Sequence, residues 1–559
     1  MNKYFEELIT FIKKEHPNKQ ALNKKKLALC SKYKTKKIPT DIEILCNTKK
    51  QDSNSLKKYL ITKPTRTISG VAVLAVMSAP FPCPHGKCIY CPGGPNSFFG
   101  DVPQSYTGNE PSTMRGIRNE FDSYRIVFNR LEQYIVLGQN PEKAEVIIMG
   151  GTFLSFKKNY KEEFVRNIFK AMNDFSAEFY DNKSFNISKF KDFFELPGNV
   201  KDEKRAENIK RKVLKLKNKN IKSLEEEKKI NENSNIRCVG LTIETKPDWG
   251  LLKHGNEMLS YGVTRVELGI QTVYDDILKK INRGHGLKES INSIKTLKDL
   301  GFKLNYHMMP GLPGVSYKKD LESLKSIFDN PDFKPDMLKI YPSLIMSGTK
   351  LFEMYKQGFH KPLKTDKASE LIVEMKKFVP RYCRIMRVQR DIPTNVTEAG
   401  VDKTNLRQYV EKLQIEKNIK CNCIRCREIK GQKIVGKTSF EIIEYDASKG
   451  KEFFISLKDE NDKLIGFCRL RFPGQFLRKE ITDDSALIRE LHVYGVAIGL
   501  NDKGTIQHKS FGKQLLKKAE EIAKQNNKKK LVVISGVGVK EYYKKLKYED
   551  DGPYMSKQF

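Results

Sequence analysis

Short apolar runs alternate with longer stretches of helical spacing over much of the chain. Six of these runs have the length and the β-branched content of buried strands: VAVLAVM (71–77), EVIIMGG (145–151), CVGLTIET (238–245), RVELGI (265–270), KLNYHMM (303–309) and MLKIYP (337–342). Strands that alternate with helices in this way form a parallel sheet or barrel. The pattern therefore predicts a (βα) domain, a partial barrel, over residues 66–345.

The C-terminal third has a different order of elements. Strands are expected near 440–445, 452–457, 463–471 and 486–494, followed by a helix at 510–525 and a strand at 530–535. This order predicts a second, compact α/β domain over 436–559. Residues 346–435, between the two domains, read as a helical linker that ends in cysteines. The run 176–235 is rich in Lys, Asn and Glu, which predicts exposed helix or a mobile surface insertion.

Charge indicates a polyanionic partner. The chain has 103 Lys and Arg against 68 Asp and Glu, a net charge of +35. Residues 1–60 alone carry a net charge of +9, with lysine clusters at 24–26 and at 34, 36 and 37. The first 65 residues are therefore predicted to be a basic helical region, and nucleic acid is the favoured partner. A solvated lysine surface is the alternative.

The number of cysteines and the length of the apolar runs predict the cellular compartment of the protein. The sequence has no apolar stretch of membrane-spanning length, and its first residues lack the apolar core of a signal peptide. We therefore expect a cytoplasmic protein with no membrane association. Eleven cysteines are an odd number for a disulfide framework, and six of them fall in two tight clusters. Such clusters in a reducing compartment indicate metal.

The first cluster is Cys83, Cys88 and Cys91, in the segment PCPHGKCIYCPGG. Three thiolates at this spacing can hold three irons of a [4Fe–4S] cluster and leave the fourth iron open for S-adenosylmethionine (SAM), as radical SAM chemistry requires. The alternative is a zinc site with His85 as the fourth ligand. Spacing alone leaves both open.

The surroundings of the first cluster favour SAM. The cysteine loop follows a strand early in the (βα) series, where barrels place their active-site loops. Gly150, Gly151 and Thr152 end the next strand, and glycines there allow backbone carbonyls to approach a ligand amino group.

The second cluster is Cys421, Cys423 and Cys426, in the segment CNCIRC. It predicts a structural zinc site that needs one more ligand, for which Cys383 or a distant histidine is a candidate. A second iron–sulfur cluster is the alternative.

The C-terminal domain carries a pattern for an acyl-CoA site. A strand at 489–495 is followed by a Gln-x-x-Ser-x-Gly turn at 507–512 that opens a helix. Backbone N–H groups at a helix N-terminus bind pyrophosphate, which is how GNAT acetyltransferases hold coenzyme A. Tyr542 and Tyr543 follow where such folds place the proton donor for the CoA thiolate.

Long sequence blocks are similar to the family of Elongator catalytic subunits, radical SAM and acetyltransferase proteins that modify the wobble uridine of tRNA. The blocks run from about residue 63 to 554 and include APFPCPHGKCIYCPGGP, CVGLTIETKPD, INRGHG, NYHMMPGLPG and RELHVYG. The compact cysteine loop and CNCIRC resemble the archaeal and bacterial single-chain branch. We therefore expect the protein to act without the full Elongator complex.

The resemblance implies roles for particular residues. It assigns Cys83, Cys88 and Cys91 to the [4Fe–4S] cluster, and Lys143 to contact with acetyl-CoA. Tyr542 and Tyr543 would act in catalysis with Lys143, and the remaining CoA contacts would be Glu490, Leu491, His492, Val493, Ser510, Phe511 and Gly512. Two positions depart from the pattern: Ser510 replaces a common glycine, and Lys246 replaces a common arginine. Glu267, Gln271, Arg283 and Tyr306 are candidates for contact with SAM or uridine.

The implied activity uses both domains. In the chemistry that the resemblance implies, the 5′-deoxyadenosyl radical takes hydrogen from the acetyl methyl of acetyl-CoA. The carbon radical then adds to C5 of uridine 34 in the anticodon stem-loop. Rearomatisation and thioester hydrolysis leave 5-carboxymethyluridine. A protein lysine acetyltransferase with a structural iron–sulfur cluster is the alternative, and a non-catalytic RNA-binding scaffold is a third reading.

Overall fold

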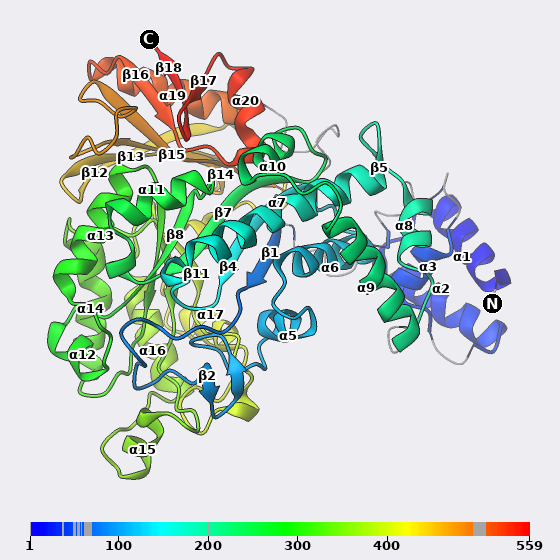
Figure 1. Cartoon of the computed structure of the whole chain (residues 1–559), viewed down its shortest axis with the longest axis horizontal. Helices are drawn as coiled ribbons and strands as arrows, with labels where there is room; N and C mark the ends of the chain where they lie inside the picture. The colour runs from blue at the N-terminus through cyan, green and yellow to red at the C-terminus, as the bar shows by residue number, and fades with distance from the viewer. Residues whose placement is uncertain are drawn as a thin grey trace.

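The computed structural model describes residues 2–35, 38–48, 52, 56, 59–60, 67, 70–199, 202–495 and 510–559. The first of its two seven-stranded sheets is parallel, with strand order β1-β4-β7-β8-β9-β10-β11. The strands are β1 (Ala72–Met77), β4 (Lys143–Met149), β7 (Arg237–Thr245), β8 (Arg265–Gln271), β9 (Lys303–Met308), β10 (Met337–Ile340) and β11 (Arg384–Arg387). The neighbours follow chain order, so the sheet curves as an open half-barrel (Figure 1).

The half-barrel confirms the six predicted strands and adds a seventh. β11 lies in the segment predicted as a helical linker, so the sheet extends past the expected boundary at residue 345. Its sequence, RIMR, is short and half charged, which conceals its strand character. Helices cover the outer face of the sheet: α6 (Ser123–Val136), α7 (Lys158–Phe179), α11 (Leu252–Ser260), α13 (Leu287–Asp299), α14 (Tyr317–Asp329) and α16 (Thr365–Lys376).

Shorter elements complete the half-barrel and its rim. They are β2 (Gly94–Ser97), β3 (Gly100–Val102), α5 (Pro111–Arg118), α12 (Asp275–Lys280), α15 (Lys350–Lys356), α17 (Leu406–Glu416) and α18 (Ile424–Arg427). β2 and β3 form a small hairpin just after the cysteine loop.

The lysine-rich insertion is helical, which confirms one of its two predicted states. It consists of the end of α7, the hairpin β5 (Tyr180–Asp181) and β6 (Ser184–Phe185), and the helices α8 (Ile187–Phe193), α9 (Glu203–Lys217) and α10 (Leu224–Asn231). Phe179, Phe190 and Phe194 are buried there, and their rings contact one another. This aromatic cluster fixes the insertion against α6 and α7.

The N-terminal region forms helices α1 (Asn2–Glu15), α2 (Lys19–Lys32) and α3 (Asp41–Cys46) around a small core of its own. These helices lie beside α8 and α9, at the far side of the half-barrel from the C-terminus (Figure 1). Lys24 is exposed, but Lys26 is buried and pairs with Asp41 at 3.0 Å. Of the predicted lysine clusters, Lys36 and Lys37 lie outside the described residues. None of the described helices is long and apolar enough to cross a bilayer.

The C-terminal domain is a second sheet in the order β12-β13-β14-β15-β16-β18-β17. Its elements are β12 (Ser439–Ala447), β13 (Gly450–Lys458), β14 (Leu464–Phe472), β15 (Ser485–Val493), α19 (Phe511–Gln525), β16 (Lys530–Val533), α20 (Lys540–Lys544), β17 (Glu549–Asp551) and β18 (Tyr554–Gln558). The predicted strands and helix are all present, while β17 and β18 were not predicted. β15 pairs with β16 only over Ser485–Ile488, so the backbone beyond Ile488 is open on that side.

Buried arginines join the two domains. Arg489 of β15 donates to both carboxylate oxygens of Asp336, which precedes β10, at 2.6 and 2.8 Å. Arg471 of β14 donates to Asp299, at the end of α13, at 2.6 and 2.8 Å. Glu452 of β13 accepts from both arginines, each at 3.0 Å. All five side chains are at most 1% exposed.

The network predicts a large cost for removing one charge. Asp336→Asn keeps the shape of the side chain but leaves Arg489 with Glu452 as its one remaining carboxylate in the network, and the loss of one partner of a buried pair costs roughly 3–5 kcal/mol. We expect a clearly lower midpoint of urea-induced unfolding. Lys451→Gln, which breaks an exposed pair with Glu444, is the control and should leave the midpoint unchanged. A wild-type midpoint for Asp336→Asn would show that the network adds no net stability.

Candidate active site

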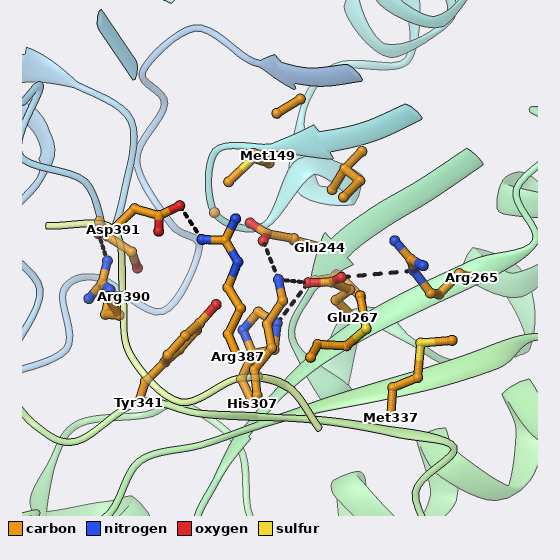
Figure 2. A pocket seen from close by; sticks show the side chains of 18 of the residues that line it. Met149, Glu244, Arg265, Glu267, His307, Met337, Tyr341, Arg387, Arg390 and Asp391 are labelled. Atoms are coloured by element: carbon orange, nitrogen blue, oxygen red, sulfur yellow. Dashed lines mark hydrogen bonds and ion pairs between the residues drawn. The ribbon is translucent and has the colours of Figure 1, made fainter. Parts of the chain in front are cut away.

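A single cavity of about 620 Å³ runs through the half-barrel, and both domains line it. At one end it is lined by the cysteine loop, with Cys83, Cys88 and Cys91. At the other end it reaches β15, with Glu490 and His492. The two predicted sites therefore share one cavity. Figure 2 shows the part of this cavity between them.

The three cysteines of the first cluster converge on the cavity. Ser105 N–H donates to Cys91 Sγ at 3.3 Å, and Arg283 Nη1 lies 3.7 Å from Cys88 Sγ. Burial raises the pKa of the Cys91 thiol to about 11. Since a thiolate is the form that binds iron, the cluster ligands need a nearby positive charge, which Arg283 supplies.

The spacing of the sulfur atoms distinguishes the two metal alternatives. Thiolates on one zinc ion stand roughly 3.8 Å apart, because each Zn–S bond is about 2.3 Å and the site is tetrahedral. The described residues contain two groups of three or more His, Cys, Asp or Glu side chains whose ligand atoms all lie within 4.8 Å of one another. Neither group contains Cys83, Cys88, Cys91 or His85. Wider spacing suits a cubane, in which each thiolate binds a different iron. His85 instead lies 3.2 Å from Cys88 Sγ through Nε2, and burial lowers its pKa to about 4.

The glycine pair at the end of β4 lies where it was predicted. Gly150 and Gly151 have φ angles of +127° and +94°, which side chains rarely adopt. A Cβ on Gly150 would stand 2.1 Å from Ser78 Oγ. Gly151 and Thr152 line the cavity beside Cys83, whose Sγ is 3.8 Å from Thr152 Oγ1. The backbone is thus open to a ligand next to the cysteine loop.

The walls of the cavity differ in polarity. Apart from Glu145 of β4, strands β1 and β4 contribute apolar side chains: Val73, Ala75, Ile147 and Met149. Strands β8 to β10 contribute a connected set of charges (Figure 2). Glu267 is its centre: it pairs with Lys339 and lies 2.9 Å from His307 Nε2. Two further ion pairs adjoin this centre: Arg265 pairs with Glu145, and Lys339 lies 3.6 Å from Glu244.

Of the four candidates for SAM or uridine contact, the structure places three in the cavity. Glu267, Gln271 and Arg283 line it. Tyr306 does not: it is fully buried on the other face of β9, where its hydroxyl donates to the carbonyl of Phe333 at 2.7 Å. Strand alternation explains the error, because a side chain next to His307 must face the opposite way.

Sequence reasoning missed His307, Lys339 and Arg265. A signal was available, since Lys303, Asn305 and His307 recur at every second position of a strand that is otherwise apolar. Polar residues at period two in a buried strand indicate a lined cavity.

The acyl-CoA end forms around β15. A bulge lies opposite Arg469 and Leu470. Arg489, the residue that the bulge leaves unpaired on β14, turns toward the half-barrel, and Glu490 and His492 line the cavity. Leu491 and Val493 pack against the core of the C-terminal domain. The predicted contact strand therefore offers side chains to the half-barrel and open backbone to β16.

The start of α19 lies close to Tyr542. A Cβ on Gly512 would stand 3.0 Å from Tyr542 Oη and 3.8 Å from Val493. The Tyr542 hydroxyl is buried without a hydrogen-bond partner in the described residues, and burial raises its pKa to about 12. Tyr543 lies in the core against Tyr548, so Tyr542 is the tyrosine that faces the helix start.

Two further CoA candidates can be placed. Ser510 has a left-handed backbone, φ +62°, which explains why glycine is common there in the resembling family. Phe511 begins α19, and the turn residues Gln507 to Lys509 lie outside the described residues. Lys143 begins β4 opposite Arg237, at the end of the sheet that faces the C-terminal domain, and burial lowers its pKa.

The second cysteine cluster is a compact group. The sulfur atoms of Cys421, Cys423 and Cys426 lie within 4.8 Å of one another, which suits a single ion. Cys383 is not part of that group. Its thiol is buried, and it contacts the loop through its carbonyl, which accepts from Ile424 N–H at 3.0 Å.

Comparisons with known proteins agree with this geometry. The radical SAM superfamily matches residues 81–327, its C-terminal domain 335–415, and the GNAT acetyltransferase family 427–548. The protein is thus a radical SAM enzyme fused to a GNAT domain, and this class implies a [4Fe–4S] cluster, SAM and acetyl-CoA.

The chain belongs to the Elp3 family. The ELP3 N-terminal domain matches residues 1–68. The chain is 45% identical to the tRNA uridine(34) acetyltransferase of Methanocaldococcus jannaschii, over 93% of this chain and 90% of that one. It is 39% identical to Elongator complex protein 3 of Schizosaccharomyces pombe, over 98% and 96%. The solved structure of Methanocaldococcus infernus Elp3 without residues 1–46 superposes with a TM-score of 0.71 at 39% identity, covering 88% of this chain and 100% of that one.

The contact between Gly512 and Tyr542 predicts a defect in CoA binding. Gly512→Ala places a methyl group 3.0 Å from Tyr542 Oη, so the tyrosine hydroxyl or the helix start must move by a few tenths of an ångström. We expect acetyl-CoA to bind about tenfold more weakly, ~1.4 kcal/mol, by isothermal titration calorimetry. Ser510→Gly is the matched control, since it relieves a left-handed serine and keeps the N–H group. An unchanged dissociation constant for Gly512→Ala would remove the helix start from the CoA site.

Proposed function

We propose that this enzyme modifies uridine 34 of tRNA, taking a two-carbon unit from acetyl-CoA to form 5-carboxymethyluridine. One observation carries the proposal: a single cavity joins the cysteine loop to β15. A lysine acetyltransferase would not need this connection, because its acyl group would leave from the GNAT face. The names of the archaeal relatives support the same substrate.

The chain supplies positions for each group. Cys83, Cys88 and Cys91 would hold the [4Fe–4S] cluster, and Gly150 to Thr152 would contact SAM beside them. With SAM bound, the cluster supplies a carbon radical able to abstract hydrogen. Glu490 to Val493, Ser510 to Gly512 and Lys143 would bind acetyl-CoA, with Tyr542 as proton donor to the CoA thiolate.

Basic residues would receive the tRNA. Arg387, Arg390 and Lys430 line the cavity, and α1 to α3 add exposed lysines. Phosphate contacts of this kind give affinity without sequence readout. An unpaired anticodon base can be splayed out of its loop, which would let it enter the cavity. We also propose that the protein acts in the cytoplasm and without the full Elongator complex; its compact cysteine loop and its higher identity to the archaeal enzyme, 45% against 39% for the S. pombe protein, support this.

The proposal is tested with the purified chain alone. The cluster is reconstituted anaerobically, and dithionite, SAM, acetyl-CoA and unmodified tRNA are added. Mass spectrometry of the digested tRNA should show 5-carboxymethyluridine only when SAM is present. Acetylation of lysine peptides with no tRNA product would favour the lysine acetyltransferase instead.

Cys88→Ser separates the two halves of the reaction. It removes one cluster ligand at one end of the cavity and leaves β15 untouched. We expect no tRNA product and no 5′-deoxyadenosine, with acetyl-CoA affinity equal to wild type by calorimetry. Cys30→Ser, in the N-terminal helices, is the control and should retain full activity. Product formation by Cys88→Ser would exclude the cysteine loop from the chemistry.

We further propose that Cys421, Cys423 and Cys426 bind zinc. Their close spacing supports this, and the ion would tie α18 to β11, since Ile424 N–H also bonds the carbonyl of Cys383. Cys423→Ser should lose the zinc measured by elemental mass spectrometry and unfold at lower temperature, while Cys30→Ser keeps both. Iron in place of zinc at this cluster, in protein purified anaerobically, would overturn the assignment in favour of a second iron–sulfur cluster.

A further inference from the structure

A histidine and a carboxylate form a pair in the cavity; His307 has no role above, and Glu267 has only been a candidate for contact with SAM or uridine. His307 of β9 and Glu267 of β8 are neighbours across the sheet, with His307 Nε2 2.9 Å from Glu267 Oε2. The His307 side chain lines the cavity and is 14% exposed, while that of Glu267 is fully buried. Figure 2 shows the imidazole between Glu267 and the ring of Tyr341.

Glu267 is held as a charged acceptor. Lys339 pairs with Oε2, and Asn305 Nδ2 donates to Oε1 at 3.1 Å. Lys339 and His307 together keep the pKa of Glu267 well below its usual range, against the effect of burial. Two neighbouring strands thus fix the carboxylate, and the carboxylate fixes the imidazole.

The imidazole is in the form of a base. Burial, helped by the charge of Lys339, lowers the pKa of His307, so the ring is neutral at physiological pH. If Glu267 accepts from Nε2–H, the proton-free nitrogen is Nδ1. Among the described residues, Nδ1 has no hydrogen-bond partner. A neutral histidine whose second nitrogen is oriented by a buried carboxylate is the usual arrangement of a general base.

The position of His307 matches the last step of the proposed reaction. It stands on β9 between the cysteine loop and β15 of the C-terminal domain. Once the acetyl carbon has joined uridine, the product is still a thioester of CoA and still lies in the cavity. Release of tRNA and CoA then requires water at the thioester carbonyl.

We propose that His307 is the general base that hydrolyses the thioester of this tRNA–CoA adduct, with Glu267 as its positioning residue. This inference rests on the proposed function. Water adds to the carbonyl carbon as its proton passes to His307 Nδ1. The C–S bond breaks, Tyr542 gives its proton to the departing CoA thiolate, and the proton on the imidazolium passes through water to restore the tyrosine. Water and thioester give a carboxylic acid and free CoA, with no oxidant or reductant.

Other groups along the cavity are committed elsewhere. His85 bonds the thiol of Cys88, and Glu244 accepts from Tyr106 Oη at 3.1 Å and faces Lys339. His492 lies on β15 at the acyl-CoA end. Among the histidines that line the cavity, His307 is the one that belongs neither to the cysteine loop nor to β15.

The test is to trap the adduct. His307→Gln enzyme is loaded with cluster, SAM, acetyl-CoA and tRNA for a single turnover, and the reaction is quenched with hydroxylamine, which converts a thioester to a hydroxamate. We expect hydrolysis to slow by about 100-fold. The digested tRNA should then contain the hydroxamate of carboxymethyluridine, whereas wild type gives the free acid. 5′-Deoxyadenosine should form at the wild-type rate. Tyr306→Phe, on the opposite face of β9, is the control and should give the free acid.

A second measurement avoids the radical step. The adduct isolated from His307→Gln is added to wild-type enzyme without SAM or reductant. Wild type should release CoA thiol and carboxymethyluridine, and His307→Gln should not. Free acid from the variant at the wild-type rate in the trapping experiment would overturn the proposal. The proposal would also be overturned if His307→Gln formed neither the adduct nor the free acid under conditions in which wild type forms the free acid. Absence of any product from wild type would instead refute the proposed function.

Discussion

Three buried arginines of the C-terminal domain, Arg469, Arg471 and Arg489, determine how the two catalytic domains meet. Their partners include Asp336 and Asp299 of the half-barrel. A buried charge that loses its partner is far more costly than an exposed one, so the interface cannot slide by one residue without a large penalty. Hydrophobic contact alone would tolerate such a shift. The network therefore sets the register of β15 against the half-barrel.

That register creates the shared cavity. The bulge in β15 lies at Arg489, which anchors the strand. The next residue, Glu490, lines the end of the cavity and pairs with Arg469 at 2.9 Å. Lys303 of β9 lies 3.6 Å from Glu490 across the boundary. Charges that hold the domains together thus continue into charges that line the reaction space. The fixed interface between the two domains thus places the acyl donor next to the half-barrel, with no transfer between separate proteins.

The sequence predicted the elements better than their faces. Apolar runs located six strands of the half-barrel, because a parallel strand buried on both sides is a continuous apolar segment. β11 was not predicted because its four residues include two arginines and so do not form a continuous apolar segment. The cysteine motif and the strand predicted before the glycine turn both contribute residues to the cavity. The pairing of His307 with Glu267 could not be predicted, since it depends on two strands being neighbours in register. Tyr306 was assigned to the cavity because the sequence does not reveal which face of β9 lines it; the adjacent residue, His307, is the one that does.

The polarity of the cavity suits two steps with opposite needs. A carbon radical survives where few polar groups and little water are near, and β1 and β4 give such a wall with Val73, Ala75, Ile147 and Met149. Thioester hydrolysis needs water, a base and fixed charge, which β8 to β10 provide. Separate sites would force the adduct to move between steps while joined to a whole tRNA. Opposite walls of one cavity require only that the acyl group turn, so the tRNA can remain bound until CoA leaves.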